Sequence, residues 1–237
     1  MNAKMKVLAL ALLGLAGYAG SAAASCPSSP VPPWTTNSPF QGTTAIVAGG
    51  LDGSACRLDS AISAGAQGFA NAQVQDDTPT NEPRYRAQFM INAAPLAAPT
   101  LITVANVFSA TGAAGTGVNL AIFGDGSGAW RLSYVVADAN DPSGFHSGSV
   151  PLPVDAPKHV EFDLDVTAGT FKVWLENNNE TTPDINDSGL NTATPIGGIE
   201  SAFLGLAAPS DAFVSTYAGT AAQFDRFDSR RTSFIGF

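Results

Sequence analysis

Short runs in which apolar and polar residues alternate make up most of the chain beyond residue 43. In the run RYRAQFMIN (84–92), Tyr85, Ala87 and Phe89 alternate with charged or amide side chains. Side chains two positions apart lie on one face of a β-strand, so this pattern indicates strands with one apolar face. Further runs of this kind, rich in β-branched or aromatic residues, occupy residues 44–48, 100–110, 117–124, 130–138, 159–166, 170–177, 202–208 and 222–230.

The same pattern leaves little room for helices. No stretch of ten or more residues has helical spacing, and the Ala-rich run INAAPLAAPT (91–100) contains two prolines, which interrupt a regular helix. Parallel strand pairs need crossover connections that are usually helical, so antiparallel pairing is favoured. We therefore predict an all-β protein, an antiparallel two-sheet β-sandwich.

The first 24 residues have the features of an export signal. Lys4 and Lys6 precede an apolar run that ends in small residues, which favours cleavage near Ala24 and a secreted or periplasmic mature protein. The alternative is a lipoprotein modified at Cys26, although Ala23 stands where a lipoprotein signal usually has Leu. The apolar run is too short for a membrane span, so we expect no transmembrane segment in the mature chain.

Two segments follow the signal in this interpretation. Residues 25–43, rich in Pro and Ser, form an extended arm with Trp34 and Phe40 as anchors, and residues 44–237 form the sandwich domain. The chain has two cysteines, Cys26 and Cys56. In an exported protein we expect them to form a disulfide that ties the arm to the domain.

The mature chain is strongly acidic. Removal of Lys4 and Lys6 with the signal leaves nine basic residues against twenty acidic ones, a net charge of −11. Nucleic acids and anionic membranes are bound through Lys and Arg, so this composition argues against both as partners.

One segment resembles a known family. In VDAPKHVEFDLDVTAGTFKVWLEN (154–177), an alternating strand leads through a Thr-Ala-Gly turn into a second strand. This resembles the central hairpin of laminin-G-like domains in the concanavalin A-like lectin and glucanase superfamily, although ENNNE replaces the usual Asp-Gly bend. The hairpin before it (117–138) and the closing strand AAQFDRFDSRR (221–231) fit the same pattern, so the likeness covers residues 84–231. The resemblance implies a jelly-roll sandwich of an exported bacterial protein, and it specifies fold better than function.

The strand KHVEFDLDV (158–166) carries three carboxylates at alternate positions, Glu161, Asp163 and Asp165. The spacing is similar to the Glu-x-Asp-x-Glu motif of laminarinase-type glucanases, so a glycoside hydrolase or polysaccharide lyase that uses these acids is one hypothesis. Asp165 is one methylene shorter than the last Glu of that motif, and a turn follows almost at once. We therefore favour a solvated strand face without a catalytic role.

A structural calcium ion is a second hypothesis. Concanavalin A-like domains often bind calcium through Asp and Asn of loops at one rim, so the resemblance makes two loops candidates. The first, ADANDPSG (137–144), offers Asp138, Asn140 and Asp141, and the second, DINDSG (184–189), offers Asp184 and Asn186. The alternative, which we favour, is that these side chains cap their own backbone in turns.

Other chemistries have weak signals. The two histidines and two cysteines have no zinc spacing, and the sequence contains neither a Gly-x-Ser-x-Gly elbow nor a phosphate-binding glycine loop. Arg226, Arg230 and Arg231 lie among Asp225 and Asp228, which predicts surface ion pairs. A site for a carboxylate-bearing glycan is the alternative use of these arginines.

Binding is the function that this sequence favours. We expect an exported, non-catalytic sandwich that recognises an extracellular glycan or protein through loops at one rim or a concave sheet face. The alternatives are the hydrolase or lyase described above and a structural protein of the cell envelope.

Overall fold

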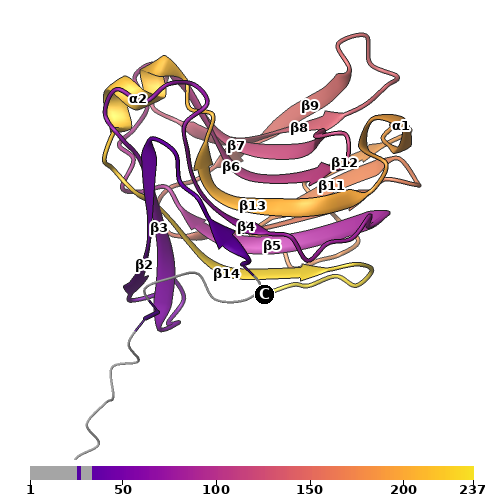
Figure 1. Cartoon of the computed structure of the whole chain (residues 1–237), viewed down its shortest axis with the longest axis horizontal. Helices are drawn as coiled ribbons and strands as arrows, with labels where there is room; N and C mark the ends of the chain where they lie inside the picture. Colours follow the sequence, from indigo (N-terminus) through magenta and orange to yellow (C-terminus); the bar gives the residue numbers. More distant parts are fainter. Residues whose placement is uncertain (1–25, 28–33) are drawn as a thin grey trace, which may run out of the picture.

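The computed structural model describes residues 26–27 and 34–237, and the predicted export signal with its cleavage site near Ala24 lies outside these residues. The described chain forms two stacked sheets of seven strands each (Figure 1). The β6 sheet contains, in order, β1 (Thr36–Asn37), β4 (Asn71–Asp76), β13 (Ile199–Ala207), β6 (Ile102–Gly112), β7 (Gly117–Asp125), β8 (Trp130–Ala137) and β9 (Phe145–Leu152). The β10 sheet contains β12 (Ile185–Ser188), β11 (Thr170–Leu175), β10 (Lys158–Asp165), β5 (Arg84–Asn92), β14 (Ala222–Arg230), β3 (Cys56–Ile62) and β2 (Gly42–Ala48). Neighbouring strands are antiparallel throughout, which confirms the predicted fold class.

The core lies between the sheets and consists of the apolar strand faces that the alternation predicted. Phe89 of β5 and Phe162 of β10 are fully buried against Phe108 of β6. The ring centroids of Phe89 and Phe108 are 5.6 Å apart, and those of Phe108 and Phe162 are 5.0 Å apart. Such aromatic pairs contribute roughly 0.5–1.5 kcal/mol beyond the burial of their area. Because these residues face inward, the alternate residues of each strand face outward.

Five strands lie outside the predicted runs. The short strands β1 and β12 lie at the edges of their sheets, where pairing on one side requires little sequence signal. β4 reads NAQVQD and β9 reads FHSGSVPL, and both carry polar or small residues in place of the β-branched and aromatic ones that mark strands. β3, with the sequence CRLDSAI, has only two large apolar residues.

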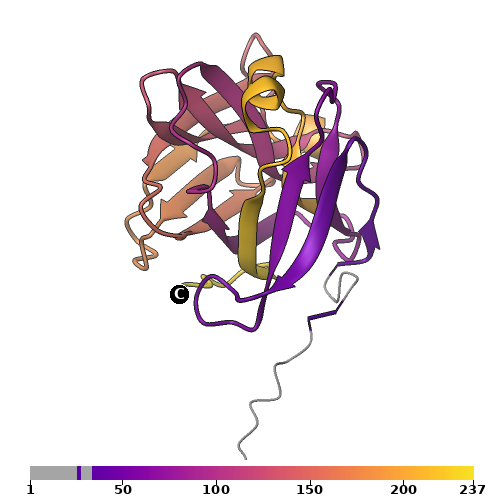
Figure 2. The same ribbon diagram turned by 90° about the vertical axis from the view of Figure 1, so that its left-hand side faces the viewer.

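Helices are short, as the sequence predicted. In the part of the chain that the structure describes they are α1 (Ala193–Ile196) and α2 (Asp211–Tyr217). The Ser210 side chain caps α2 by accepting a hydrogen bond from the backbone of Phe213 at 3.2 Å. Figure 2 views the end of the sandwich that carries α2 and the β2–β3 hairpin. Neither helix has the length and hydropathy of a membrane span, and the same holds for the described residues as a whole.

The end of the N-terminal arm is part of the sandwich. Cys26 and Cys56 form the predicted disulfide, with Cα atoms 5.8 Å apart. The ring of Trp34 packs against Phe227 with a centroid distance of 4.4 Å, and strand β1 pairs with β4. β2 already begins at Gly42, so the chain enters both sheets before the domain start that we placed at residue 44.

Candidate functional site

The three alternating acids lie on the outer face of the β10 sheet, and two of them are buried. Glu161 and Asp163 are 2% and 3% exposed, whereas Asp165 is partly exposed. An oxygen of Glu161 lies 2.9 Å from Nε of Arg86, a side chain that is itself 1% exposed. Asp163 accepts hydrogen bonds from Nε and Nη2 of Arg84 at 2.9 and 2.6 Å. Arginines of the neighbouring strand β5 therefore neutralise both buried acids.

The chain after β14 folds back over this face. The backbone N–H groups of Ile235 and Gly236 donate to the two oxygens of Glu161 at 3.0 and 2.9 Å. Asp165 has a local partner instead, the backbone N–H of Ala168 at 2.7 Å. Figure 1 places the C-terminus beneath β5 and β14, on the side of the sandwich away from the β6 sheet.

Aromatic rings complete the cover. The guanidinium of Arg86 packs against both Trp174 and Phe234, 4.8 and 5.0 Å from the ring centroids. Cation–π contacts of this kind strengthen when water is excluded. The prediction that the acidic strand face is solvated is therefore wrong for Glu161 and Asp163, because β5 arginines and C-terminal residues cover them.

In the first loop considered for calcium, the candidate side chains form hydrogen bonds with backbone groups. Oδ1 of Asp138 accepts from the backbone N–H of Asn140 and of Asn191, at 2.9 and 2.8 Å. Asn140 donates from its side chain to the carbonyl of Gly189 at 3.1 Å. Asp141 accepts from the backbone N–H two residues further on at 2.8 Å. These are the contacts of Asx turns, and they also hold the two candidate loops together.

The second loop has the same character. Asp184 accepts from the backbone N–H of Leu175 at 2.8 Å, and Asn186 is exposed on β12 opposite Lys172. Across residues 26–27 and 34–237, no three His, Cys, Asp or Glu side chains are grouped closely enough to hold a metal ion. The geometry therefore gives the calcium hypothesis no converging carboxylates, and the hypothesis stays untested.

The three arginines in and directly after β14 form ion pairs, as predicted for surface charges. Arg230 pairs with Asp228 of the same strand at 3.2 Å. Arg226 pairs with Asp52 in the β2–β3 turn at 3.5 Å, and Arg231 reaches an acid that precedes β5 at 2.9 Å. Each of the three guanidinium groups thus has its own carboxylate partner, which gives no support to a shared anion site.

The outer face of the β6 sheet has a different composition. Directly paired residues of antiparallel strands project to the same side, so the register gives the order of side chains across this face. One row contains Gln75, Phe203, Ser109, Asn119, Val135 and Ser147. The next row contains Asn71, Ala207, Asn106, Ala121, Ser133 and Ser149. We call these two rows the polar rows.

The polar rows cross six strands that lie about 4.8 Å apart, so each is about 24 Å long. They contain amide, hydroxyl and apolar side chains, including the ring of Phe203, and no acid, lysine, histidine or tyrosine. A third row begins with Val104 and Phe123 and includes Arg131, which donates to Ser149 at 2.8 Å. The strands curve, with α2 at one end and the β8–β9 hairpin rising at the other (Figure 1).

A small hollow lies at the β4 end of the polar rows. It measures about 90 Å³ and is lined by Ser38, Asn71, Gln73, Gln75 and Phe203. Gln73 donates to the carbonyl of Gly205 at 3.2 Å. The side-chain carbonyl oxygen of Gln73 accepts no hydrogen bond from the residues that the structure describes, so it is available to a ligand.

Two exposed aromatic rings lie at this end of the sheet, next to Asn71 of the hollow. Phe40 and Phe69 are 48% and 68% exposed, and their rings stack with centroids 5.6 Å apart. Phe40 forms a β-bridge with Asn71, which directs it to the same side as the polar rows. Exposed apolar surface beside polar groups is typical of ligand-binding grooves.

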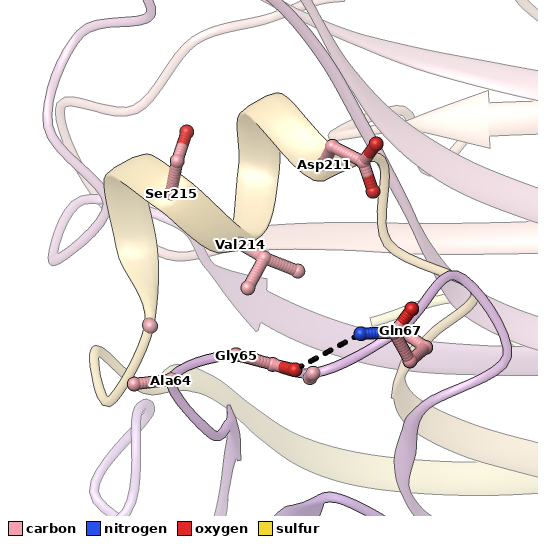
Figure 3. Close-up of a pocket in the computed structure, with 8 residues that line it drawn as sticks. Ala64, Gly65, Gln67, Asp211, Val214 and Ser215 are labelled. Atoms are coloured by element: carbon pink, nitrogen blue, oxygen red, sulfur yellow. Dashed lines mark hydrogen bonds between the residues drawn. The ribbon is translucent and has the colours of Figure 1, made fainter.

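A larger hollow of about 410 Å³ lies between α2 and the loop that joins β3 to β4 (Figure 3). Val214 points from the helix toward this loop, whereas the hydroxyl of Ser215 points away from it. Gln67 donates a side-chain N–H to the carbonyl of Gly65 at 3.2 Å. Small residues form most of the lining, and few polar groups converge there, so this hollow is the weaker candidate.

Sequence reasoning missed a cluster at the open edge between β9 and β12. Tyr134 donates to Asp187, and Nε2 of His146 lies 3.2 Å from the same carboxylate. Burial, and then the bond to Asp187, raise the pKa of Tyr134 far above its usual value. The cluster therefore joins the two sheets and holds the tyrosine in its neutral form at physiological pH.

The polar rows were missed as well, although a signal existed. Outward positions of β6 and β7 read Asn106, Ser109 and Asn119, where exposed strands usually carry charged residues as well. Their alignment depends on the strand register, which the sequence does not give.

Comparison with known proteins supports the fold. No protein-family model matches the chain, and no curated protein matches it. An endo-β-1,4-glucuronan lyase from the fungus Trichoderma reesei is similar with a TM-score of 0.59 and 15% identity, over 86% of this chain and 94% of that one. An alginate lyase in complex with an alginate tetrasaccharide has a TM-score of 0.50 and 8% identity, over 76% and 82% of the two chains. The binding domain of botulinum neurotoxin DC in complex with SialylT has a TM-score of 0.50 and 6% identity, over 84% and 44%.

At these identities the likeness concerns the fold alone. The neighbours are β-sandwich jelly-roll proteins, which is consistent with the concanavalin A-like resemblance read from the sequence. The chain is therefore a jelly-roll β-sandwich.

Proposed function

We propose that this protein binds a neutral glycan across the outer face of the β6 sheet and does not cleave it. The composition of the polar rows carries this proposal, because their amides and hydroxyls lie beside the partly exposed ring of Phe203. Amides and hydroxyls pair with sugar hydroxyls, and an aromatic ring offers an apolar surface to the C–H face of a pyranose. Phe40 and Phe69 extend that surface at the β4 end.

Charge favours a neutral ligand over a polyuronate. A polyuronate carries a carboxylate on every sugar and needs cations to bind it. In the three rows named above the only cation is Arg131, which is already engaged by Ser149. The mature chain, with its predicted net charge of −11, also repels a polyanion at long range.

Composition also argues against catalysis on this face. Cleavage of a glycan by hydrolysis or elimination needs a general acid or base, a role filled by His, Asp, Glu, Lys or Tyr. The polar rows contain none of these types. On the opposite sheet, we propose that Glu161 and Asp163 stabilise the fold through their arginines and take no part in chemistry.

The structural neighbours support a glycan as the ligand class. Two of them are lyases named for glucuronan and alginate, so related sandwiches act on polysaccharides. A polysaccharide lyase is accordingly the second candidate function, and it predicts unsaturated products that absorb in the ultraviolet. The laminin-G-like resemblance and a role as a structural envelope protein stay predictions.

We also propose that the protein acts outside the cytoplasm. The disulfide between Cys26 and Cys56 supports this location, because such bonds persist in oxidising compartments. Whether cleavage occurs near Ala24 or lipid is attached at Cys26 stays a prediction from the sequence.

A polysaccharide array tests the proposed function. The neutral members are a β-1,3-glucan, xyloglucan, galactomannan and arabinoxylan, and the acidic members are alginate, polygalacturonate and polyglucuronate. We expect binding to at least one neutral glycan and to none of the acidic ones. Phe203→Ala and Gln73→Ala each weaken that binding about tenfold, as loss of one well-placed contact typically does.

Lys172→Ala is the matched control, because Lys172 lies partly exposed on the outer face of the opposite sheet. It leaves glycan binding unchanged. Absence of binding to every neutral glycan, or equal binding by wild type and both face variants, contradicts the proposal. Release of unsaturated products supports the lyase in its place.

A further inference from the structure

A pocket on the outer face of the β10 sheet has no part in the proposed function. It measures about 390 Å³ and is lined by Asp52, Gln88, His159, Arg226 and Phe237. These residues come from the β2–β3 turn, from β5, β10 and β14, and from the C-terminal segment. The volume lies in the range of small-molecule sites.

Two buried polar atoms of this pocket have no hydrogen-bond partner among the residues that the structure describes. They are the carbonyl oxygen of the Gln88 side chain and Nδ1 of His159. Buried polar atoms are nearly always paired, and one left over needs an explanation, of which a bound water, ion or ligand is one. Both residues line the same pocket, although the two atoms themselves are closed to solvent. Rotation of the two side chains toward the pocket would let one ligand, or its hydration shell, satisfy both atoms.

The hydrogen-bonding chemistry of the two atoms describes the ligand. The Gln88 oxygen can only accept, so it needs a donor. Burial lowers the pKa of His159, so its imidazole is neutral at physiological pH and offers one donor and one acceptor. A ligand that fits both residues must donate and accept at neighbouring positions, as a pair of hydroxyl groups does.

An aromatic ring forms one wall of the pocket. Phe237 stacks on the imidazole of His159 with centroids 4.3 Å apart and planes 7° from parallel. Phe237 is 48% exposed as a residue, so its surface is not fully covered. It can therefore hold the apolar face of a ring compound.

The charges of the pocket favour a neutral ligand. Arg226 and Asp52 pair at 3.5 Å, so a charged ligand of either sign gains one attraction and one repulsion. Arg226 has a φ of 54°, in the left-handed region, and lies where the β14–β5 register shifts between Asp225 and Asp228. Such bulges redirect side chains, and strained backbone is concentrated at functional positions.

We propose that this pocket binds a neutral, polyhydroxylated ring of monosaccharide size. Its hydroxyl groups pair with Gln88, His159 and Asp52, and its C–H face lies against Phe237. The site is independent of the glycan face, since the two lie on opposite sheets.

Nuclear magnetic resonance titration of the whole protein with D-glucose, D-galactose, D-mannose and N-acetyl-D-glucosamine tests this site. At least one sugar shifts the side-chain amide signals of Gln88 and the ring signals of His159, with a dissociation constant of roughly millimolar order. Gln88→Leu removes the unpaired oxygen, and His159→Phe removes Nδ1 but keeps a ring against Phe237. Each variant lowers the affinity for that sugar about tenfold.

Lys172→Ala, whose position on β11 does not line this pocket, binds the same sugar as tightly as wild type does. Circular dichroism verifies that each variant is folded. If Gln88→Leu does not fold, the affinity of His159→Phe for the sugar tests the proposal by itself. The proposal is overturned if none of the four sugars shifts these signals, or if His159→Phe binds as wild type does. If Gln73→Ala weakens binding of the sugar and the two pocket variants do not, the sugar binds to the glycan face instead.

Discussion

Arg86 connects most of the charged groups on the outer face of the β10 sheet. It is 1% exposed, lies 2.9 Å from Glu161 and 3.1 Å from Glu180, and contacts two aromatic rings. Glu161 in turn receives two backbone N–H groups of the C-terminal segment. The carboxylate therefore serves two roles at once, as counter-ion to a buried cation and as anchor for the end of the chain.

This arrangement gives Glu161→Gln a large effect on stability. The substitution leaves a buried guanidinium without its nearest counter-ion, and breaking a buried ion pair costs about 3 kcal/mol or more. Urea denaturation measures the free energy of unfolding of the variant against wild type. Asp165→Asn is the control, because its partly exposed side chain keeps an oxygen for Ala168 and loses less than about 1 kcal/mol. Equal stability of Glu161→Gln and wild type would show that the ion pair has no structural role.

His159 makes stability depend on pH. Burial is the largest influence and lowers its pKa below 6.5, against the opposing effect of Glu176 and Asp52 and with a further lowering by Arg226. The unfolded chain therefore takes up this proton first, and the stability due to His159 falls as pH drops below about 6.5. We expect His159→Phe to reduce the difference in unfolding free energy between about pH 7.5 and about pH 5.5. An unchanged difference contradicts this assignment, because the acids common to both proteins cancel in the comparison.

Pairings between distant residues could not be predicted from the sequence. The alternation placed Glu161 and Asp163 on one face, and that placement is correct. Their burial depends on which strand lies beside β10 and in which register, and on a C-terminal segment whose short, mixed sequence carries no strand signal. The cysteine pairing was predictable because the chain has only two cysteines.

At the scale of elements, the disulfide ties the N-terminal arm to β3. The cysteines are 30 residues apart, and closing a loop of this length stabilises the folded state by roughly 3–4 kcal/mol on the chain-entropy account. We expect the double variant Cys26→Ser/Cys56→Ser to lose about that much unfolding free energy in denaturant. Trp34 and β1 still hold the arm, so the variant stays folded. Loss of less than about 0.5 kcal/mol would mean that the unfolded arm is already constrained without the bond.

Strands with strong side-chain signals were predictable, and those with weak ones were not. β5 to β8, β10, β11, β13 and β14 carry β-branched or aromatic residues that mark a buried face. β4 and β9 lack that signal and are held by their neighbours β13 and β8. The candidate site was therefore hard to predict from the sequence, because β4, which has a weak strand signal, supplies the amides beside Phe203.

The whole molecule presents two outer faces of different chemistry. The β10 sheet carries ion pairs beneath a C-terminal cover, and the β6 sheet carries the uncharged polar rows. Sequence alone directed attention to the first face, because acids at alternate positions resemble a catalytic motif. The proposed function assigns glycan binding to the second face, because its polar rows carry no charged side chain and include the partly exposed ring of Phe203.

The overall charge makes ionic strength a further probe of this account. Polyanion binding through Arg or Lys weakens steeply as salt rises, because counterions compete. Binding through uncharged rows depends on hydrogen bonds and apolar contact, so its affinity changes by less than about twofold over the same range. Affinity electrophoresis in a gel that contains the bound glycan measures this, and a strong decline with salt contradicts a neutral interface.

Mapping of side-chain amide signals tests the central claim most directly. The measurement is a titration of isotope-labelled protein with an oligosaccharide of the neutral glycan that the array identifies. The account predicts that the shifted amide signals are those of the β6 sheet, namely Asn71, Gln73, Gln75, Asn106 and Asn119. Shifts confined to amides outside this face, such as those of Asn186 and Gln223, would contradict it.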